Sequence, residues 1–227
     1  MSAVQFSSPC RFVVLFSGRG SNMQAIAHAL ESADLHAELA AVITNKADAP
    51  GLGWARARGI VSHTVAHRDY ESRESFDQAL GDVIERYNPD YVLLAGFMRV
   101  LTPSFVERYY GRLINIHPSL LPAFPGLHTH QQALAAGVQW HGCTVHFVTP
   151  VLDHGPVLAQ GVVSVRSSDT PDSLAQRLLE VEHHVYAQVV RWLAQRRVSL
   201  DAMQRVEIQG VRSRAFLSTP EGVIAFE

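Results

Sequence analysis

Two polar side chains stand one residue apart at the end of an apolar strand, within residues 113–122. Asn115 and His117 alternate there with Ile114 and Ile116, and alternate side chains of a strand point to the same face. An amide and an imidazole held side by side could stabilise the negative charge that develops on a carbonyl oxygen. The alternative is a strand that simply ends in polar residues before a Pro-rich loop.

An acidic turn follows later, where Asp153 lies in the sequence Leu-Asp-His-Gly-Pro at residues 152–156. Gly and Pro favour a defined turn that presents the carboxylate. If Asp153 lies close to His117, it favours the charged imidazolium. It could also accept a proton from an attacking amine, directly or through one water. An Asx turn, in which Asp153 bonds to its own backbone, is the alternative.

A glycine-containing loop, Phe-Ser-Gly-Arg-Gly-Ser-Asn at residues 16–22, follows the first expected strand and opens the first expected helix. Glycines allow close approach of the backbone, and helix N-terminal N–H groups favour an anion. The loop lacks both the Gly-Lys-Ser/Thr ending of a P-loop and the full dinucleotide fingerprint, so a phosphorylated small molecule fits best. A tight turn capped by Ser21 or Asn22 is the alternative.

The remaining histidines carry weaker signals. His128 and His130 form a His-x-His pair that could chelate a metal ion, but no third ligand stands at a recognisable metal spacing. We therefore expect loop hydrogen bonding there and no metal. We expect His183 and His184 to be surface or packing residues of the last helix.

The elements that position these residues alternate along the first half of the chain. We expect strands over residues 12–16, 39–44, 61–65, 91–95 and 113–117, with helices over 21–31, 51–58, 70–87 and 102–109. This alternation predicts an α/β fold, a Rossmann-like open and mainly parallel sheet with helices on both faces and right-handed crossovers.

The pattern changes in the second half, where strands over residues 143–148 and 157–165 predict a mixed or antiparallel C-terminal part. Thr170 and Pro171 open a last long helix. Its expected buried stripe is Leu174, Leu178, Val181, Val185, Val189 and Trp192. We predict one domain over residues 1–198 and a C-terminal extension over 199–227, strand-like between 206 and 216, without an assigned function.

The composition excludes several classes of protein. The 227 residues are 47% hydrophobic and 18% charged, with a formal net charge of −2, which suits one globular domain. No Lys/Arg-rich stretch marks a nucleic-acid partner, and no apolar run approaches the roughly 20 residues of a membrane helix. Residues 1–9 lack a signal-peptide pattern. Cys10 and Cys143 give neither a zinc spacing nor a disulfide framework, which predicts a cytoplasmic location.

Five ordered motifs together resemble the folate-dependent phosphoribosylglycinamide formyltransferase family of purine biosynthesis. They are Gly-Ser-Asn at 20–22, Leu-Ala-Gly-Phe-Met-Arg at 94–99, Asn-x-His-Pro-Ser-Leu-Leu-Pro at 115–122, Pro-Gly-Leu-His-Thr-His at 125–130 and Leu-Asp-x-Gly-Pro at 152–156. The resemblance runs from about residue 12 to residue 197. It implies formyl transfer from 10-formyltetrahydrofolate to the amino group of glycinamide ribonucleotide, without a metal ion.

The resemblance also implies roles for particular residues. The catalytic residues would be Asn115 and His117, which stabilise the oxyanion, and Asp153, which keeps His117 charged and helps a water carry protons. The ribonucleotide would be bound by Gly20, Ser21, Asn22, Leu179 and Glu182. The folate would be bound by Arg73, Met98, Arg99, Val100, Leu101, Asn115, Thr149, Pro150, Val151, Leu152 and Asp153. The N-terminal half of the domain would bind the phosphate, and the C-terminal half would bind folate.

Two positions depart from the family pattern, and rival functions remain open. Leu179 stands where a polar residue often helps to grip the substrate, and His154 stands where a second glycine is common. A formyltetrahydrofolate hydrolase would use the same three residues with water as acceptor and would carry an N-terminal regulatory domain. A methionyl-tRNA formyltransferase would need a basic C-terminal domain. A non-catalytic folate or nucleotide-binding module would lack the three residues. We expect small-molecule partners only, and a monomer or homodimer.

Overall fold

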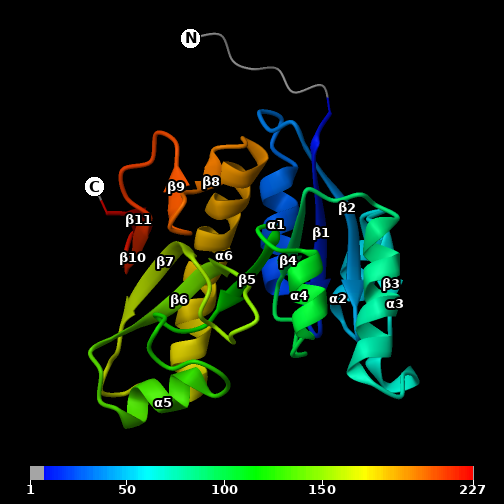
Figure 1. The fold of residues 1–227 in the computed structure, drawn as a ribbon. Coiled ribbons are helices and arrows are strands. Elements are labelled where there is room, and N and C mark those ends of the chain that lie inside the picture. The colour runs from blue at the N-terminus through cyan, green and yellow to red at the C-terminus, as the bar shows by residue number, and fades with distance from the viewer. Residues whose placement is uncertain (1–7, 227) are drawn as a thin grey trace.

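A nine-stranded sheet with helices on both faces forms the body of the protein (Figure 1). The computed structural model describes residues 8–226. Along the sheet the strands run β11-β10-β7-β6-β5-β4-β1-β2-β3. Their bounds are β1 Cys10–Phe16, β2 Ala37–Thr44, β3 Ser62–Thr64, β4 Tyr91–Leu94, β5 Leu113–His117, β6 Trp140–Phe147, β7 Val157–Ser164, β10 Ala215–Thr219 and β11 Gly222–Ala225.

Helices connect these strands, and a separate two-stranded sheet follows the last helix. The helices are α1 Ser21–Leu30, α2 Gly51–Ala57, the short 3-10 helix η1 His67–Asp69, α3 Arg73–Glu85, α4 Pro103–Arg108, α5 Thr129–Ala135 and α6 Pro171–Ala194. The small sheet pairs β8 Val198–Leu200 with β9 Val206–Ile208. Within residues 8–226, no helix has the length and apolar character needed to cross a membrane.

The expected parallel sheet is confirmed. Strands β3, β2, β1, β4 and β5 pair in parallel, and apolar side chains on both faces of β1 are buried. Val13 and Leu15 belong to a core shared with α3 and α4, while Phe12, Val14 and Phe16 belong to a core shared with α1 and α6. Strands that are covered on both faces have continuous apolar sequences, which explains why these strands could be predicted from the sequence.

The change to antiparallel pairing is also confirmed. Strand β6 runs antiparallel to β5 and to β7. Helix α6 begins with a capping box in which Thr170 accepts the N–H of Ser173, and the six apolar residues of its predicted stripe are all buried. The helix packs against α1 as well as against β6 and β7, so it joins the two halves of the sheet.

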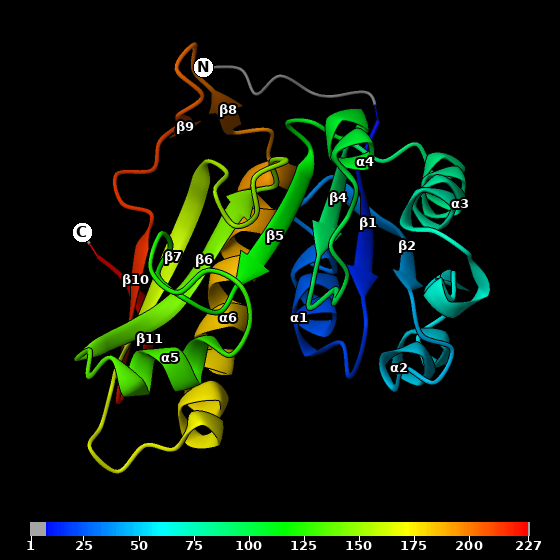
Figure 2. The ribbon, with the colours of Figure 1, turned by 60° about the horizontal axis from the view of Figure 1, so that its bottom comes forward.

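Two features were not anticipated. Helix α5 is a seven-residue element that packs against α6 (Figure 2), and it is too short to show a helical period. Beyond residue 198, β10 pairs in parallel with β7 and β11 pairs antiparallel with β10, so the extension adds two strands to the main sheet. The expected strand-like stretch over 206–216 is divided between β9 and β10. Whether residues 1–198 form a domain without this addition stays a prediction.

Candidate active site

His117 lies at the end of β5, buried between two oxygen atoms. Its Nε2 is 3.0 Å from the main-chain oxygen of Phe124, and its Nδ1 is 3.5 Å from Oδ2 of Asp153. A carbonyl oxygen and a carboxylate oxygen only accept hydrogen bonds, so an imidazole with protons on both nitrogens can donate in both directions. The ring is therefore held in place from both sides.

Asp153 reaches His117 from the turn after β6. Its φ of 52° puts it in the left-handed region, which Asp tolerates better than most residues. The main-chain N–H of Gly126 donates a hydrogen bond of 2.8 Å to Oδ2, the oxygen that faces His117. The structure thus brings together the strand end and the acidic turn that the sequence placed 36 positions apart.

Asn115 is oriented by a histidine on the neighbouring strand. Its Nδ2 is 3.4 Å from Nε2 of His146, which is its register partner on β6. Nδ1 of His146 is 2.9 Å from the carbonyl oxygen of Phe147 and so carries the proton, while burial lowers the pKa of His146. Neutral His146 therefore presents a lone pair to one N–H of Asn115 and leaves the other N–H for a ligand.

The glycine loop faces the last long helix. Gly20 caps α1, which begins at Ser21, and Nδ2 of Asn22 donates a 2.7 Å hydrogen bond to Oε2 of Glu182. Glu182 is buried, and burial raises its pKa to about 7 although the bond from Asn22 opposes this shift. Oδ1 of Asn22 is buried and has no hydrogen-bond partner among residues 8–226. Leu179, half-buried one helical turn before Glu182, adds an apolar side chain there.

Two loops carry the residues expected to bind folate. The loop over residues 98–101 follows β4, whose Leu94 pairs with Asn115, and the loop over 149–153 carries Asp153. Four apolar side chains on these loops are exposed, with Met98 at 66%: Met98, Val100, Val151 and Leu152. Large exposed apolar side chains gathered around polar groups are typical of a ligand site.

The other expected folate residues differ in accessibility. Pro150 and Arg73, the first residue of α3, are exposed. The guanidinium of Arg99 lies 5.6 Å from the ring centre of Phe76, and Leu101 is buried. The hydroxyl of Thr149 donates to the carbonyl oxygen of Val151.

His130, the second histidine of the His-x-His pair, contacts His141. Nδ1 of His130 is 3.1 Å from Nε2 of His141, and burial lowers the pKa of both, that of His141 to about 4. In the part of the chain that the structure describes, no group of three or more His, Cys, Asp or Glu side chains could hold a metal ion. His184 packs edge-on against Phe216, as expected of a packing residue.

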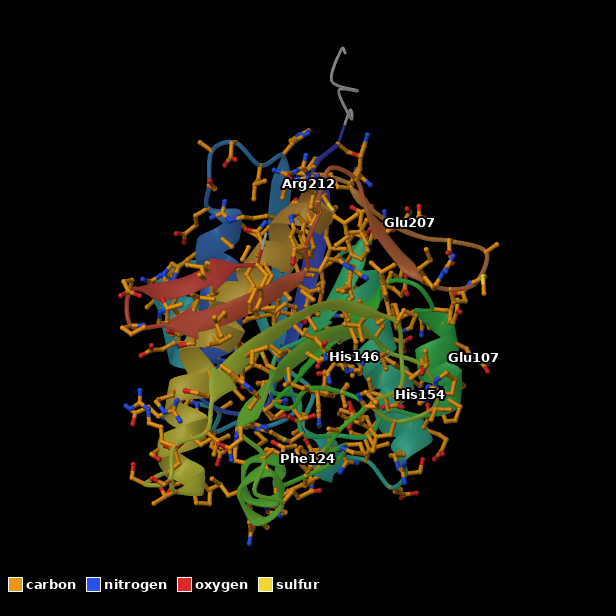
Figure 3. All side chains as sticks on the ribbon, turned by 90° about the vertical axis from the view of Figure 1, so that its left-hand side faces the viewer. Glu107, Phe124, His146, His154, Glu207 and Arg212 are labelled. Atoms are coloured by element: carbon orange, nitrogen blue, oxygen red, sulfur yellow. The ribbon has the colours of Figure 1, made fainter. Side chains whose placement is uncertain are left out.

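Three contributors to the site were not predicted from the sequence: His146, Phe124 and Gly126. In Figure 3, Phe124 lies in the lower part of the view and His146 near its middle, both below Glu207 and Arg212 of the C-terminal extension. His146 could have been found from strand pairing, since it stands opposite Asn115. Phe124 and Gly126 act through main-chain atoms, and side-chain chemistry gives no signal for such a role.

Comparison with known proteins decides the family. Residues 10–190 match the family described as formyl transferase. The chain belongs to this family. It is 50% identical over 188 residues to the phosphoribosylglycinamide formyltransferase of Escherichia coli, a match that covers 83% of this chain and 89% of that one. It also superposes on the solved phosphoribosylglycinamide formyltransferase of Coxiella burnetii with a TM-score of 0.83 and 44% identity, over 89% of this chain and 95% of that chain.

A less similar solved structure has a different activity in its name. The formyltetrahydrofolate deformylase of Pseudomonas syringae superposes with a TM-score of 0.81 and 27% identity. That match covers 89% of this chain but only 66% of the deformylase chain. This chain is therefore more similar to the phosphoribosylglycinamide formyltransferases, both in identity and in the share of their length that it matches. It is a formyltransferase of the kind found in purine biosynthesis.

Proposed function

We propose that the chain transfers the formyl group of 10-formyltetrahydrofolate to the amino group of glycinamide ribonucleotide. The observation that carries the proposal is the position of Asp153, 3.5 Å from His117 at the end of the strand that also presents Asn115. The 50% identity to the Escherichia coli phosphoribosylglycinamide formyltransferase supports the choice of substrates.

The residues at the start of α1 and Glu182 support a phosphorylated ribose compound as the formyl acceptor. Residues Gly20, Ser21 and Asn22 form the N-terminus of the ten-residue helix α1, where unpaired main-chain N–H groups favour a phosphate. Glu182 would accept hydrogen bonds from the ribose hydroxyls, close to the unpartnered Oδ1 of Asn22. Leu179 would contact the same substrate through its apolar side chain.

The loops over residues 98–101 and 149–153 support a large, partly apolar ring system as the formyl donor. The exposed side chains of Met98 and Val100 on one loop, and of Val151 and Leu152 on the other, could cover the faces of the pteridine ring. Main-chain groups of residues 98–101 would bond its polar edge, and Arg73 and Arg99 would attract the folate carboxylates. When bound, the folate supplies the formyl group at the oxidation level of the product.

The chain's own residues then provide orientation and charge stabilisation. The free N–H of Asn115 would donate to the formyl oxygen, on which negative charge builds up as the amine attacks. Nε2 of the His117 imidazolium would share its proton between that oxygen and the carbonyl oxygen of Phe124. Asp153 would balance the charge of His117 and help a water molecule carry a proton from the attacking amine to N10 of the folate. The bond between N10 and the formyl carbon then breaks, and tetrahydrofolate leaves. His146 keeps the amide of Asn115 in the donating orientation.

Further statements belong to the same proposal. We propose that the reaction needs no metal ion, that no nucleic acid takes part, and that the protein works as a monomer or homodimer in the cytoplasm. Both cysteines, Cys10 and Cys143, are free and buried, which suits a reducing compartment.

The second candidate is hydrolysis of formyl-folate, which the 27% identity to the deformylase supports. Water would then replace the amine, and the Asn22–Glu182 pair would have no substrate to bind. An absorbance assay of folate deformylation, run with and without glycinamide ribonucleotide, separates the two reactions. We expect turnover only with the ribonucleotide; equal rates in its absence would establish the hydrolase.

The same assay tests the three catalytic residues. Loss of one oxyanion donor typically lowers turnover about 100- to 1,000-fold, so we expect a loss of this size for His117→Ala and a comparable loss for Asp153→Asn. The exposed His36→Ala serves as a control, because His36 lies in the turn before β2 and should leave turnover unchanged. Wild-type turnover in His117→Ala would remove the proposed role.

A further inference from the structure

The hydroxyl of Ser17 joins the ends of three neighbouring parallel strands. Ser17 directly follows β1, and its Oγ accepts the main-chain N–H of Met98, in the loop after β4, at 2.7 Å. The same hydroxyl donates to Oδ1 of Asn45, which directly follows β2, at 2.6 Å. The main-chain N–H of Ser17 also donates to the carbonyl oxygen of Gly96 at 3.1 Å. Ser17 thus connects the glycine loop to the loop expected to bind folate.

We propose that Ser17 is a positioning residue that holds the folate-side loop, residues 96–101, in register with the ribonucleotide-side loop, residues 17–22. This inference rests on the proposed function, because the two loops would carry the two substrates. Formyl transfer requires the amine and the formyl carbon to meet within about 3–3.5 Å, and a misplacement of 1 Å can cost 100-fold in rate. A direct link between the two loops provides this register.

The burial of this network makes the link strong. Ser17 is 3% exposed and Asn45 is 2% exposed, so water has little access to replace either partner. A hydroxyl has one proton to donate, and here it goes to Asn45 while the oxygen accepts from Met98. Ser17 therefore acts through both bonds at once, which neither alanine nor a purely apolar residue could reproduce.

A second buried side chain ties down the other end of the folate-side loop. Oδ2 of Asp77, on α3, accepts the main-chain N–H of Thr102 at 2.6 Å. The residues between these two anchors include Met98 and Val100, whose side chains are exposed. The loop thus keeps its apolar side chains free for a ligand while its ends are attached to the sheet and to α3.

The test is Ser17→Ala, compared with a capping variant of similar expected stability loss. Removal of the hydroxyl leaves the N–H of Met98 and the amide oxygen of Asn45 unpaired. We expect the KM for 10-formyltetrahydrofolate to rise about tenfold or more, with a lower kcat, from the typical cost of an unsatisfied buried group. Thr170→Ala removes the N-cap of α6 and should lower the melting temperature while KM and kcat stay at wild-type values.

Asn45→Ala supplies a second variant with an independent prediction. It removes the acceptor of the Ser17 proton and the 3.2 Å contact of Asn45 Nδ2 with Nδ1 of His67, but Ser17 still accepts the N–H of Met98. We therefore expect a smaller rise in KM for the folate. Because the two residues act through one network, the double variant should show less than the product of the two single effects. Fully multiplicative effects on KM would contradict a shared network.

Hydrogen–deuterium exchange separates this inference from the proposed function. In Ser17→Ala the peptide over residues 96–101 should exchange faster, while peptides of β6 and β7 should exchange at wild-type rates. Unchanged exchange in 96–101, or faster exchange with KM and kcat within twofold of wild type, overturns the inference. If the wild-type chain transfers no formyl group, the proposed function fails. The link is then tested by exchange and by the affinity for a folate analogue with carbon in place of N10, which must fall in Ser17→Ala.

Discussion

Gly126 donates its main-chain N–H to Oδ2 of Asp153 at 2.8 Å, and that oxygen is the one facing His117. Two residues earlier in the chain, the carbonyl oxygen of Phe124 lies 3.0 Å from the other ring nitrogen of His117. One short loop therefore contacts both members of the His–Asp pair through main-chain atoms. The geometry of the pair depends on the backbone of this loop as well as on the two side chains.

Gly126→Ala should lower kcat at a modest cost in stability. Gly126 has a φ of 81°, and a Cβ added there would meet no atom within 4 Å, so the variant is strained but not crowded. An L-residue in this region costs about 1–2 kcal/mol, which the loop can relieve by moving its N–H away from Asp153. We expect at least a tenfold loss of kcat in the transfer assay.

Gly137→Ala is the matched control for this substitution. Gly137 has a φ of 66°, also with no atom within 4 Å of an added Cβ, and it lies after α5. The same strain there should lower the melting temperature by a similar amount without changing kcat. Equal losses of kcat in the two variants would show that the loop acts only through general stability.

Substitutions at the start of α1 should weaken ribonucleotide binding and leave folate binding unchanged. Asn22→Ala removes both the donor that orients Glu182 and the Oδ1 atom that is free to bind the ribonucleotide. An unsatisfied buried group costs about 1–3 kcal/mol, so we expect a 10- to 100-fold weaker affinity. Ser21→Ala should act in the same direction. Titration calorimetry with glycinamide ribonucleotide measures the change, and the exposed His28→Ala on the same helix is the control. Unchanged affinity in Asn22→Ala would count against a phosphate site in this loop.

Glu182 should make the stability of the fold depend on pH. Burial raises its pKa from 4.5 to about 7, so between these values the folded chain holds a proton that the unfolded chain has released. The free energy of unfolding should therefore fall as pH rises from about 4.5 to about 7, by on the order of 3 kcal/mol from this group.

Glu182→Gln keeps the acceptor for Asn22 but cannot ionise, so it should remove that part of the pH dependence. Urea unfolding of both proteins at pH 4.5, 6 and 7.5 gives the comparison. The difference between wild type and variant should grow in favour of the variant up to pH 7 and stay constant above it. Curves that run parallel over the whole range would exclude a raised pKa at Glu182.

The C-terminal strands should contribute stability and not catalysis. Phe216 on β10 is buried, with its ring centre 6.2 Å from Trp192 and 5.5 Å from His184, both on α6. Phe216→Ala should lower the free energy of unfolding by about 3–5 kcal/mol, as for other buried aromatic residues. The control is Ile224→Ala on β11, where the side chain is 51% exposed.

For Phe216→Ala and Ile224→Ala, urea denaturation measures the free energy of unfolding, and the transfer assay measures kcat at 25 °C. We expect the control to change the free energy of unfolding by less than about 1 kcal/mol, because an exposed side chain loses little contact. Both variants should keep wild-type kcat while folded. A selective loss of kcat in Phe216→Ala would instead connect the extension to the site.

The core of the fold followed from local sequence patterns. The continuous apolar runs of β1, β2, β4 and β5 and the helical stripe of α6 are local features, and the structure contains all of them close to the expected bounds. Helix α5 and the strands β10 and β11 were harder to predict, because short elements contain too few residues to show a helical or strand period. Their formation depends on neighbours, α6 for α5 and β7 for β10.

Residue types and their spacing identified the groups available for chemistry: the amide of Asn115, the imidazole of His117, the carboxylate of Asp153 and the glycine loop. The contacts that hold these groups became visible only in the folded chain. His146 opposes Asn115 through strand pairing, Phe124 and Gly126 hold His117 and Asp153 through main-chain atoms, and Ser17 links two loops. Residue type and spacing reveal side-chain chemistry, whereas main-chain hydrogen bonds between distant segments arise only when the chain is packed.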